Sequence, residues 1–294
     1  MTKFVLCLFM LLGTYCFTQS VYRPIPTDNN IFLHYENDLF ARTDRYYTQG
    51  FQVGVNYFPK VCFWGEIIKH YELKQDVYTP SSIKSDSLLN RDRPYAATLS
   101  VKVEEMAIYE SGFSSMIGTE FGIIGPAAGG KQMQTGIHKA TNNFLPLGWQ
   151  HQINNGLIAD VYVQLEKRMI NLDSVFQLVA GVTARGGTFR THLNPTMKMI
   201  FGNQKTNRIH GYWQNALLGV IYDGSLQGSL IAKESEYVLS STEIIHFVFQ
   251  SELGFEMKFN KVGIAFNYGL QSKTFRNQLT RFHSWGGVTL SCKF

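Results

Sequence analysis

Hydrophobic and polar residues alternate one by one in segments that recur from residue 31 to the end of the chain. The last segment ends on an aromatic residue, and one of its faces consists of Val288, Leu290, Cys292 and Phe294. Alternation with a period of two predicts β-strands that have one apolar and one polar face. A closing strand that ends on an aromatic residue is typical of an outer-membrane β-barrel.

About twelve such segments occur, and a membrane-crossing strand needs about 9–11 residues. They are Ile31–Asn37, Phe51–Tyr57, Trp64–Tyr78, Ala97–Tyr109, Ser114–Ile124, Ile158–Arg168, Val175–Arg185, Pro195–Phe201, Gly211–Tyr222, Ile245–Phe259, Val262–Ser272 and Trp285–Phe294. The pattern predicts an all-β protein, a transmembrane antiparallel β-barrel of about 12 strands.

The lengths of the connections support this topology, because outer-membrane barrels have short periplasmic turns and longer outer loops. The connections after even strands are brief: Pro59–Phe63, Glu110–Phe113, Ile170–Asp173 and Asn260–Lys261. Those after odd strands are longer: Thr79–Arg93, Gly125–Asn155, Asp223–Ile244 and Thr274–Ser284. A soluble twisted sheet gives no reason for this difference, and a secreted β-sandwich or lipocalin-like barrel is the alternative.

The N-terminal segment has the features of an export signal. Lys3 precedes an apolar run from Phe4 to Phe17, and small or polar residues follow around Thr18 and Ser20. We expect residues 1–20 to be a cleaved signal peptide and residues 21–294 to form the barrel domain. An uncleaved helical anchor is the alternative, but the run is short for a bilayer, and no later run of about 18 apolar residues predicts a transmembrane helix.

The composition also favours a barrel over a soluble domain. Charged residues make up 17% of the 294 residues and aromatic residues 14%, whereas soluble domains carry about 25% charged residues. The net charge of +5 is too small to indicate nucleic acid binding, but it favours an anionic partner such as a phosphorylated lipid. After signal cleavage Cys62 and Cys292 would remain, and whether they pair is open.

Polar residues gather in the segments assigned to the outer end of the barrel. They include Asn37 and Asp38 after the first strand, Thr48 before the second, Lys84 and Arg91 in the second outer loop, and Gln134 and His138 in the third. Each has an ordinary structural explanation: Asn and Asp form turns, Asp92 beside Arg93 suggests a surface ion pair, Gly129-Gly130 suggests a flexible bend, and a lone histidine is often a packing residue. Their convergence on one rim points to a site.

The chemical types of these residues suit metal-assisted ester hydrolysis. Asp38 and Asn37 offer the hard oxygen ligands that Ca²⁺ prefers. A histidine such as His138 can take a proton from water near neutral pH, and Lys84 or Arg91 could hold a phosphate. A cation would polarise the ester carbonyl and stabilise the oxyanion. Motifs such as Gly-x-Ser-x-Gly and His-Glu-x-x-His are missing, although a Ser–His hydrolase needs no short motif.

Several short motifs occur together between Asn37 and Asn155. They are Asn37-Asp38, Tyr47-Thr48-x-Gly50, Gln75-Asp76-Val77-Tyr78-Thr79-Pro80-Ser81, Asp92-Arg93-Pro94-Tyr95-Ala96, Gly122-Ile123-Ile124-Gly125-Pro126-x-Ala128-Gly129-Gly130, Gln134, His138 and Trp149-Gln150-x-Gln152. With this set the sequence resembles the lipid A 3′-O-deacylase family of Gram-negative outer membranes, the LpxR type. Beyond Asn155 the barrel pattern and the terminal Phe294 match.

The resemblance implies a twelve-stranded barrel whose active site lies between the barrel wall and a helix in an outer loop, here Gln132–Asn142. It makes His138 the base that activates water, with Asn37 and Thr48 as further catalytic residues, and it places Asn37 and Asp38 in a Ca²⁺-dependent centre with Thr48 beside them. We expect Lys84, Arg91 and Gln134 to bind the substrate. One departure concerns an acidic residue that the family has shortly after the histidine, where this chain has Asn142, Asn143 and Phe144.

The resulting hypothesis is a calcium-dependent enzyme of the Gram-negative outer membrane that hydrolyses the 3′-linked acyloxyacyl ester of lipid A. Its expected partners are lipid A, or lipopolysaccharide, and outer-membrane lipids. We expect no nucleic acid partner and a monomer. The alternatives are another lipid esterase, such as a phospholipase, and a non-catalytic pore, adhesin or structural barrel. Many Gly, Ala and aromatic residues on the predicted inward faces favour a filled barrel over a pore.

Overall fold

The computed structural model describes residues 28–38, 45–58, 61–62, 65–88, 92–172, 175–202, 208–232 and 234–294. The signal peptide expected at residues 1–20 and the expected substrate-binding residue Arg91 lie outside these ranges and stay predictions. None of the helices in the described ranges has the length and hydropathy needed to span a bilayer.

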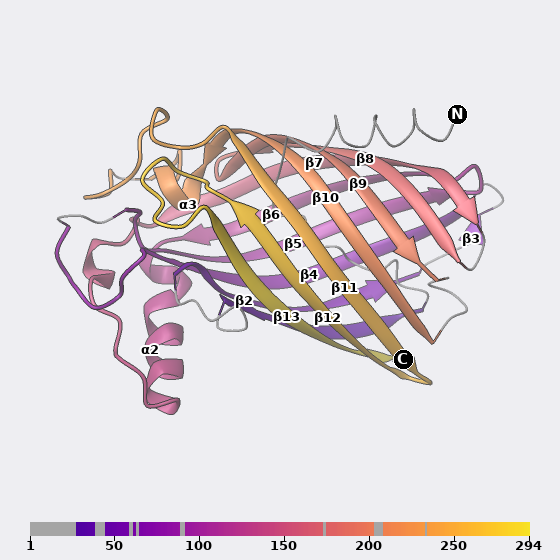
Figure 1. The fold of residues 1–294 in the computed structure, drawn as a ribbon, viewed down its shortest axis with the longest axis horizontal. Helices are drawn as coiled ribbons and strands as arrows, with labels where there is room; N and C mark the ends of the chain where they lie inside the picture. The colour runs from indigo at the N-terminus through magenta and orange to yellow at the C-terminus, as the bar shows by residue number, and fades with distance from the viewer. Residues whose placement is uncertain are drawn as a thin grey trace.

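The described chain forms one sheet of thirteen strands, shown in Figure 1. The strands are β1 (Asn30–Asn37), β2 (Tyr46–Tyr57), β3 (Val61–Cys62), β4 (Gly65–Thr79), β5 (Ala96–Tyr109), β6 (Phe113–Ile124), β7 (Gly156–Leu172), β8 (Phe176–Gly187), β9 (Arg190–Phe201), β10 (Ile209–Asp223), β11 (Phe247–Phe259), β12 (Val262–Ser272) and β13 (Phe282–Lys293). The helices are η2 (Pro126–Ala128), α2 (Gly130–Ala140), η3 (Trp149–His151) and α3 (Gly224–Gln227).

The sheet closes on itself. β1 pairs antiparallel with β13 on one side, Asn37 opposite Gly286, and with β2 on the other, Asn37 opposite Gln49. β2 also pairs with β4, so the two-residue β3 is an addition at the start of β4 and not a member of the ring. The ring of twelve antiparallel strands that remains confirms the predicted fold class.

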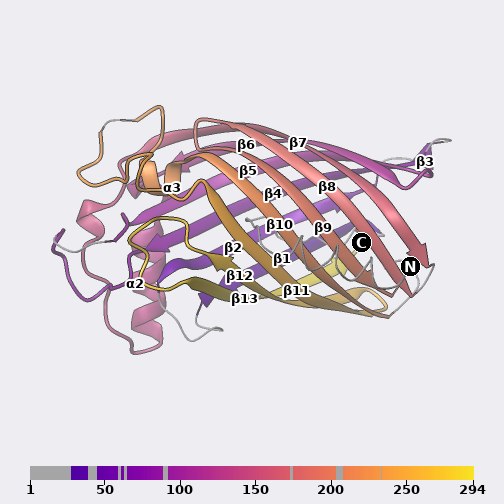
Figure 2. The ribbon, with the colours of Figure 1, turned by 45° about the horizontal axis from the view of Figure 1, so that its top comes forward.

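The long connections lie at one end of the barrel together with α2 and α3, and Figure 2 shows this end opposite the C-terminus. The predicted difference in loop length is therefore confirmed for most connections. One outer connection is short, because Thr188 and Phe189 alone join β8 to β9. Phe189 is 1% exposed, and its carbonyl accepts a hydrogen bond from Gly224 N, so this tight turn is packed under the β10–β11 loop.

The outer surface of the barrel is apolar and its interior is polar. Exposed large hydrophobic residues line the strands on the outside, among them Leu73, Val101, Phe121, Val161 and Val163. Buried polar residues line the inside, among them Glu36, Gln52, Asp76, Glu120, Asp160, Gln214 and Gln250. This arrangement is the one that a membrane-spanning barrel requires.

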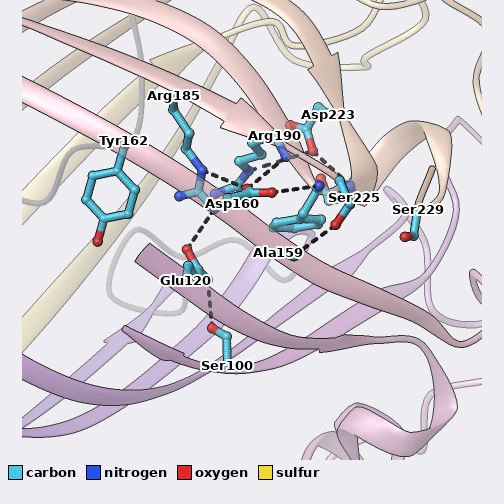
Figure 3. A network of polar contacts seen from close by, with 12 residues as sticks. Ser100, Glu120, Ala159, Asp160, Tyr162, Arg185, Arg190, Asp223, Ser225 and Ser229 are labelled. Atoms are coloured by element: carbon cyan, nitrogen blue, oxygen red, sulfur yellow. Dashed lines mark hydrogen bonds and ion pairs between the residues drawn. The ribbon is translucent and has the colours of Figure 1, made fainter. Parts of the chain in front are cut away.

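The inward faces were expected to carry many Gly, Ala and aromatic residues. The structure shows more charged side chains in the interior than this prediction implies. Arg185 Nη2 lies 2.7 Å from Glu120 Oε2 and 2.6 Å from Asp160 Oδ2 (Figure 3). Opposite charges that meet between neighbouring strands on the inner face make such inward residues tolerable. A cavity of about 220 Å³ lies among them.

An apolar cluster lies at the loop end of the lumen. It contains Leu218 and Val220 of β10, Leu226 and Leu239 of the following loop, and also Tyr46, Ile244, Val248 and Phe275. The lumen thus holds charged side chains around a cavity, with this apolar cluster at the loop end. Cys292 is a free thiol at the exposed surface.

Candidate active site

Helix α2 starts at a close approach to the barrel wall that requires glycine. Gly129 precedes the helix with φ 75°, a left-handed conformation that favours glycine. A Cβ atom on Gly130 would lie 2.3 Å from Ala97 Cβ and 3.0 Å from the Trp149 ring. The Gly129-Gly130 pair is therefore not a simple flexible bend, because it allows α2 to begin directly against β5.

This contact lies on the outside of the barrel. Lys74 and Asp76 of β4 line the lumen, so the residues between and after them, Gln75 and Val77, face outward. Val77 is fully buried in a cluster that contains Ile83, Tyr95, Ala97, Ala128 and Trp149. Gln75 Nε2 donates a 2.6 Å hydrogen bond to the carbonyl of Ala128. Helix α2 and the loop around it thus cover the outer surface of β4 and β5, with which α2 is in contact.

One face of α2 is buried. It carries Gly130, Gln134 and His138, which are spaced four residues apart and so share one side of a helix. Trp149 Nε1 donates a 2.8 Å hydrogen bond to Gln134 Oε1, while the buried Nε2 of Gln134 has no hydrogen-bond partner among the described residues. The expectation of a helix near residues 132–142 is confirmed, with a start and an end two residues earlier.

The contacts of His138 define its tautomer. Its Nδ1 lies at hydrogen-bond distance from the carbonyl oxygen of Phe144. Because a carbonyl can only accept, Nδ1 carries the proton and Nε2 is the basic nitrogen of the neutral ring. His138 is 5% exposed, so the ring orientation is fixed by packing as well as by this bond.

Asn142 and Asn143, which stand where the resembled family has an acidic residue, end helix α2. Asn142 has φ 53°, a conformation that asparagine adopts more easily than most residues. The Asn143 amide N–H donates to the His138 carbonyl at 2.8 Å. These two residues therefore shape the turn that brings Phe144 back to His138.

Lys84 joins the same group through Phe144. Its ammonium lies 4.4 Å from the centre of the Phe144 ring, a cation–π contact. The two loop segments are held together nearby, because Leu147 N donates to the Ile83 carbonyl at 2.8 Å. The structure thus brings Lys84, Gln134 and His138 together around α2, and we call these three residues the α2 group.

Asn37, Asp38 and Thr48 lie at the facing ends of β1 and β2, and we call them the β1–β2 group. Asn37 Nδ2 donates to the Tyr35 hydroxyl at 2.9 Å. Asp38 is 1% exposed, and its Oδ2 accepts a 2.6 Å hydrogen bond from the amide N–H of Arg45. The structure brings these three predicted residues together through strand pairing.

Thr48 occupies a β-bulge. The register of β2 against β4 shifts between Tyr47 and Gln49, which leaves Thr48 as the extra residue. Bulges redirect single side chains and are frequent near active sites. The Thr48 hydroxyl lies 2.7 Å from the Thr79 hydroxyl, and Thr79 follows Val77 by two positions on the outer face of β4.

The two groups share the outer surface of the barrel. Glu36 and Tyr47 line the lumen, so the neighbouring Asn37 is directed outward, as Thr48 is through its bond to Thr79. Helix α2 lies against β4 and β5, next to β2 in the sheet. The candidate site is therefore on the outside of the wall, beside α2, and not in the lumen.

The oxygen atoms of the β1–β2 group are of the kind that a hard cation such as calcium prefers, although only one of the three residues carries a carboxylate. The described part of the chain holds no group of three His, Cys, Asp or Glu side chains that could bind a metal. Asp38 offers a buried carboxylate, and Asn37 offers an amide oxygen whose partner nitrogen is engaged with Tyr35. A calcium ion here would need backbone, hydroxyl or water oxygens as well, which calcium accepts readily.

The structure also corrects the ordinary explanation of Asp92. This carboxylate forms no surface pair with Arg93 but accepts hydrogen bonds from the Tyr46 hydroxyl at 3.0 Å and from Ser81 N at 2.9 Å. Arg93 instead donates to the Ser225 carbonyl at 2.8 Å, and its burial lowers the pKa of the guanidinium. Sequence reasoning missed this tie between the loops because its partners are distant along the chain.

Residues 4–294 match the family described as "Outer membrane protein LpxR". Among solved structures, LpxR from Salmonella typhimurium is similar with a TM-score of 0.74 and 20% identity, covering 90% of this chain and 100% of that one. The translocator domain of the autotransporter NalP from Neisseria meningitidis has a TM-score of 0.48 and 9% identity, covering 92% of this chain and 89% of that one. A comparison with curated protein sequences finds no match.

Proposed function

Because the chain belongs to the LpxR family of outer membrane proteins, we propose that it is an outer-membrane lipid A deacylase that hydrolyses the 3′-linked acyloxyacyl ester. The observation that carries the proposal is the position of His138 on the buried face of α2, outside the barrel wall. A site on the outer wall faces the lipids of the surrounding membrane, whereas a site inside the lumen would not.

His138 is the proposed general base. With Nδ1 donating to the Phe144 carbonyl, Nε2 can take a proton from a water molecule as that water attacks the ester carbonyl. After the tetrahedral intermediate forms, the imidazolium can return the proton to the departing sugar oxygen. The bond from Nδ1 keeps the ring in one orientation through both steps, as a backbone acceptor does for other catalytic histidines.

Asp38 and the amide oxygen of Asn37 are the proposed protein ligands of a calcium ion. When bound, the ion would supply a Lewis acid that polarises the ester carbonyl and offsets the negative charge of the intermediate. Asp38 suits this role because it is a carboxylate, the kind of hard oxygen ligand that calcium prefers.

Lys84, Arg91 and Gln134 are proposed to bind the substrate. The exposed ammonium of Lys84 can pair with a lipid A phosphate, and its position over Phe144 places that charge beside the segment that holds His138. The Nε2 of Gln134, for which the described part of the chain offers no acceptor, is a donor that a substrate oxygen or a water molecule can satisfy. We propose no nucleic acid partner and a monomeric barrel.

The test is mass spectrometry of lipid A from cells that express the wild type, His138→Ala or His151→Ala. His151 is the matched control, since it lies in the same loop on η3 and bonds Glu236 at the surface. We expect loss of the 3′ chains with the wild type and His151→Ala, and intact lipid A with His138→Ala. Deacylation by His138→Ala, or acyl loss from glycerophospholipids alone, would contradict the proposal.

A further inference from the structure

We infer that Glu36 and Tyr47, whose side chains lie inside the barrel, are positioning residues for the site on its outer surface. The inference rests on the proposed function, because it concerns how Asn37 and Thr48 are held for that reaction. Each of these residues follows one of the inferred positioning residues directly in the chain. In a strand such neighbours point to opposite faces.

Glu36 is the centre of a hydrogen-bonding group in the lumen. Its side chain is 1% exposed. Its Oε1 accepts hydrogen bonds of 3.1 Å from Trp285 Nε1 and 3.1 Å from Asn267 Nδ2, and its Oε2 accepts one of 2.8 Å from the Tyr47 hydroxyl. Three donors from β13, β12 and β2 thus hold one carboxylate of β1, which fixes the end of that strand immediately before Asn37.

Tyr47 connects this group to β4. Its hydroxyl also lies 3.1 Å from Asp76 Oδ1, and its ring packs edge-on against Trp285 with 5.6 Å between the ring centres. Gly50 leaves the space for the hydroxyl, because a Cβ atom at position 50 would lie 2.0 Å from it. The Tyr47-Thr48-x-Gly50 motif therefore has a physical explanation: Tyr47 reaches across Gly50 while the bulge turns Thr48 outward.

The two anchors act on both strands of the β1–β2 group. Glu36 is paired in register with Gly50 of β2 and Gly287 of β13, and Tyr47 with Tyr78 of β4. The direct bond between Glu36 and Tyr47 therefore ties the backbone before Asn37 to the backbone before Thr48. Charged hydrogen bonds of this kind are among the stronger ones in proteins, so they set the spacing of the outward side chains.

The anchors are also part of a larger internal network. Lys74 Nζ lies 2.9 Å from Asp76 Oδ2, and Arg190, shown in Figure 3, donates to the Tyr78 hydroxyl at 2.7 Å. Tyr78 lies 3.5 Å from Asp76 Oδ2. Tyr47 is thus held through Asp76 by a network that includes Lys74, Tyr78 and Arg190. In this inference the charged interior supports catalysis without touching the substrate.

The experiment compares Tyr47→Phe with the control Tyr212→Phe in purified, folded barrels. Tyr212 is buried in the lumen on β10 and donates to Glu252 Oε1 at 2.7 Å, so the control removes the same kind of bond away from the site. We expect Tyr47→Phe to lower kcat for lipid A about 10- to 100-fold with little change in KM, because small misplacements of reacting groups have effects of this size. The control should keep the wild-type kcat.

Glu36 variants add a rescue test. Glu36→Gln keeps an oxygen that can accept from Trp285 and Asn267, so it should retain more activity than Glu36→Leu, in which no acceptor is left. Hydrogen exchange of the amides of residues 46–50 should be faster in Tyr47→Phe than in Tyr212→Phe. This second readout does not depend on catalysis.

The outcomes separate the two claims. Wild-type kcat and unchanged exchange in Tyr47→Phe would overturn the positioning role while the proposed function stands. An equal loss in Tyr47→Phe and Tyr212→Phe would also overturn it, since that is the result of general destabilisation. If the wild type itself leaves lipid A intact, the proposed function fails, and the exchange of residues 46–50 alone decides whether Glu36 and Tyr47 hold this segment.

Discussion

At the scale of single residues, the site depends on side chains whose neighbours in sequence face the opposite way. Asn37 and Thr48 are directed outward, while Glu36 and Tyr47 line the lumen. This arrangement gives a membrane-facing site the support of a polar interior. An enzyme that acts on a lipid can thus position polar groups at its outer surface through contacts made inside the barrel.

The variant Asp38→Asn tests whether this residue is a calcium ligand. Asp38→Asn replaces the one buried carboxylate of the β1–β2 group by a neutral amide, which binds calcium less strongly. We expect the calcium concentration for half-maximal deacylation to rise at least about tenfold, because changes even to outer-shell partners of metal ligands cost about 10- to 100-fold in affinity. This concentration is measured by titrating calcium and following the deacylation rate of each variant.

Asp86→Asn is the control for that titration, since Asp86 is exposed in the outer loop near Lys84. It should leave the calcium dependence unchanged. If Asp38→Asn and the wild type respond identically to calcium, Asp38 is not a ligand.

At the scale of elements, helix α2 is held against the wall by a small apolar contact. Trp149 is 1% exposed, packs in the cluster with Val77 and Ala97, and donates the hydrogen bond to Gln134. These interactions, together with the close approach of Gly130, determine where His138 lies. The helix belongs to the site because of this docking and not because of its own stability, since an 11-residue helix is marginal in isolation.

Trp149→Ala should therefore detach α2 from the wall. Replacement of a buried tryptophan by alanine costs about 3–5 kcal/mol, and here the loss falls on the docking of the helix. We expect faster hydrogen exchange in residues 130–140 and loss of deacylation from a barrel that still folds. Trp213→Ala is the control, because Trp213 is 39% exposed on the outer surface of β10; similar exchange in both variants would refute this account of docking.

The sequence was sufficient to predict the strands, because their signal is local. A period of two identifies each strand, and the twelve expected segments all lie within strands β1, β2 and β4–β13 or extend past them by a few residues. The end of α2 could not be placed to the residue, since Asn142 stops the helix through its backbone conformation. The bulge at Thr48 and the tie between Tyr46 and Asp92 were also missed, because both depend on pairing with distant strands and loops.

At the scale of the whole molecule, the barrel is stabilised from inside by compensated charges. Arg185 lies between Glu120 and Asp160, and Ser100 donates to Glu120 at 2.6 Å. The outside contributes little that is specific, since apolar side chains there meet lipid.

Arg185→Ala should lower the stability of the folded barrel. It removes the cation that lies between two buried carboxylates, and breaking a buried pair in this way costs about 3–5 kcal/mol. The temperature at which the heat-modifiable barrel unfolds on a gel should fall. Lys69→Ala, which removes an exposed ion pair with Glu105, should leave that temperature nearly unchanged. If both variants lower the unfolding temperature equally, the internal ion pairs stabilise the barrel no more than an exposed pair does.

The central claim is tested most directly by incubating purified lipid A with the purified barrel in micelles, wild type or His138→Ala, each with calcium or a chelator, followed by mass spectrometry. The account predicts loss of the 3′-linked chains with the wild type in calcium and intact lipid A in the other three samples. Intact lipid A in all four samples, with the barrel folded, would contradict it.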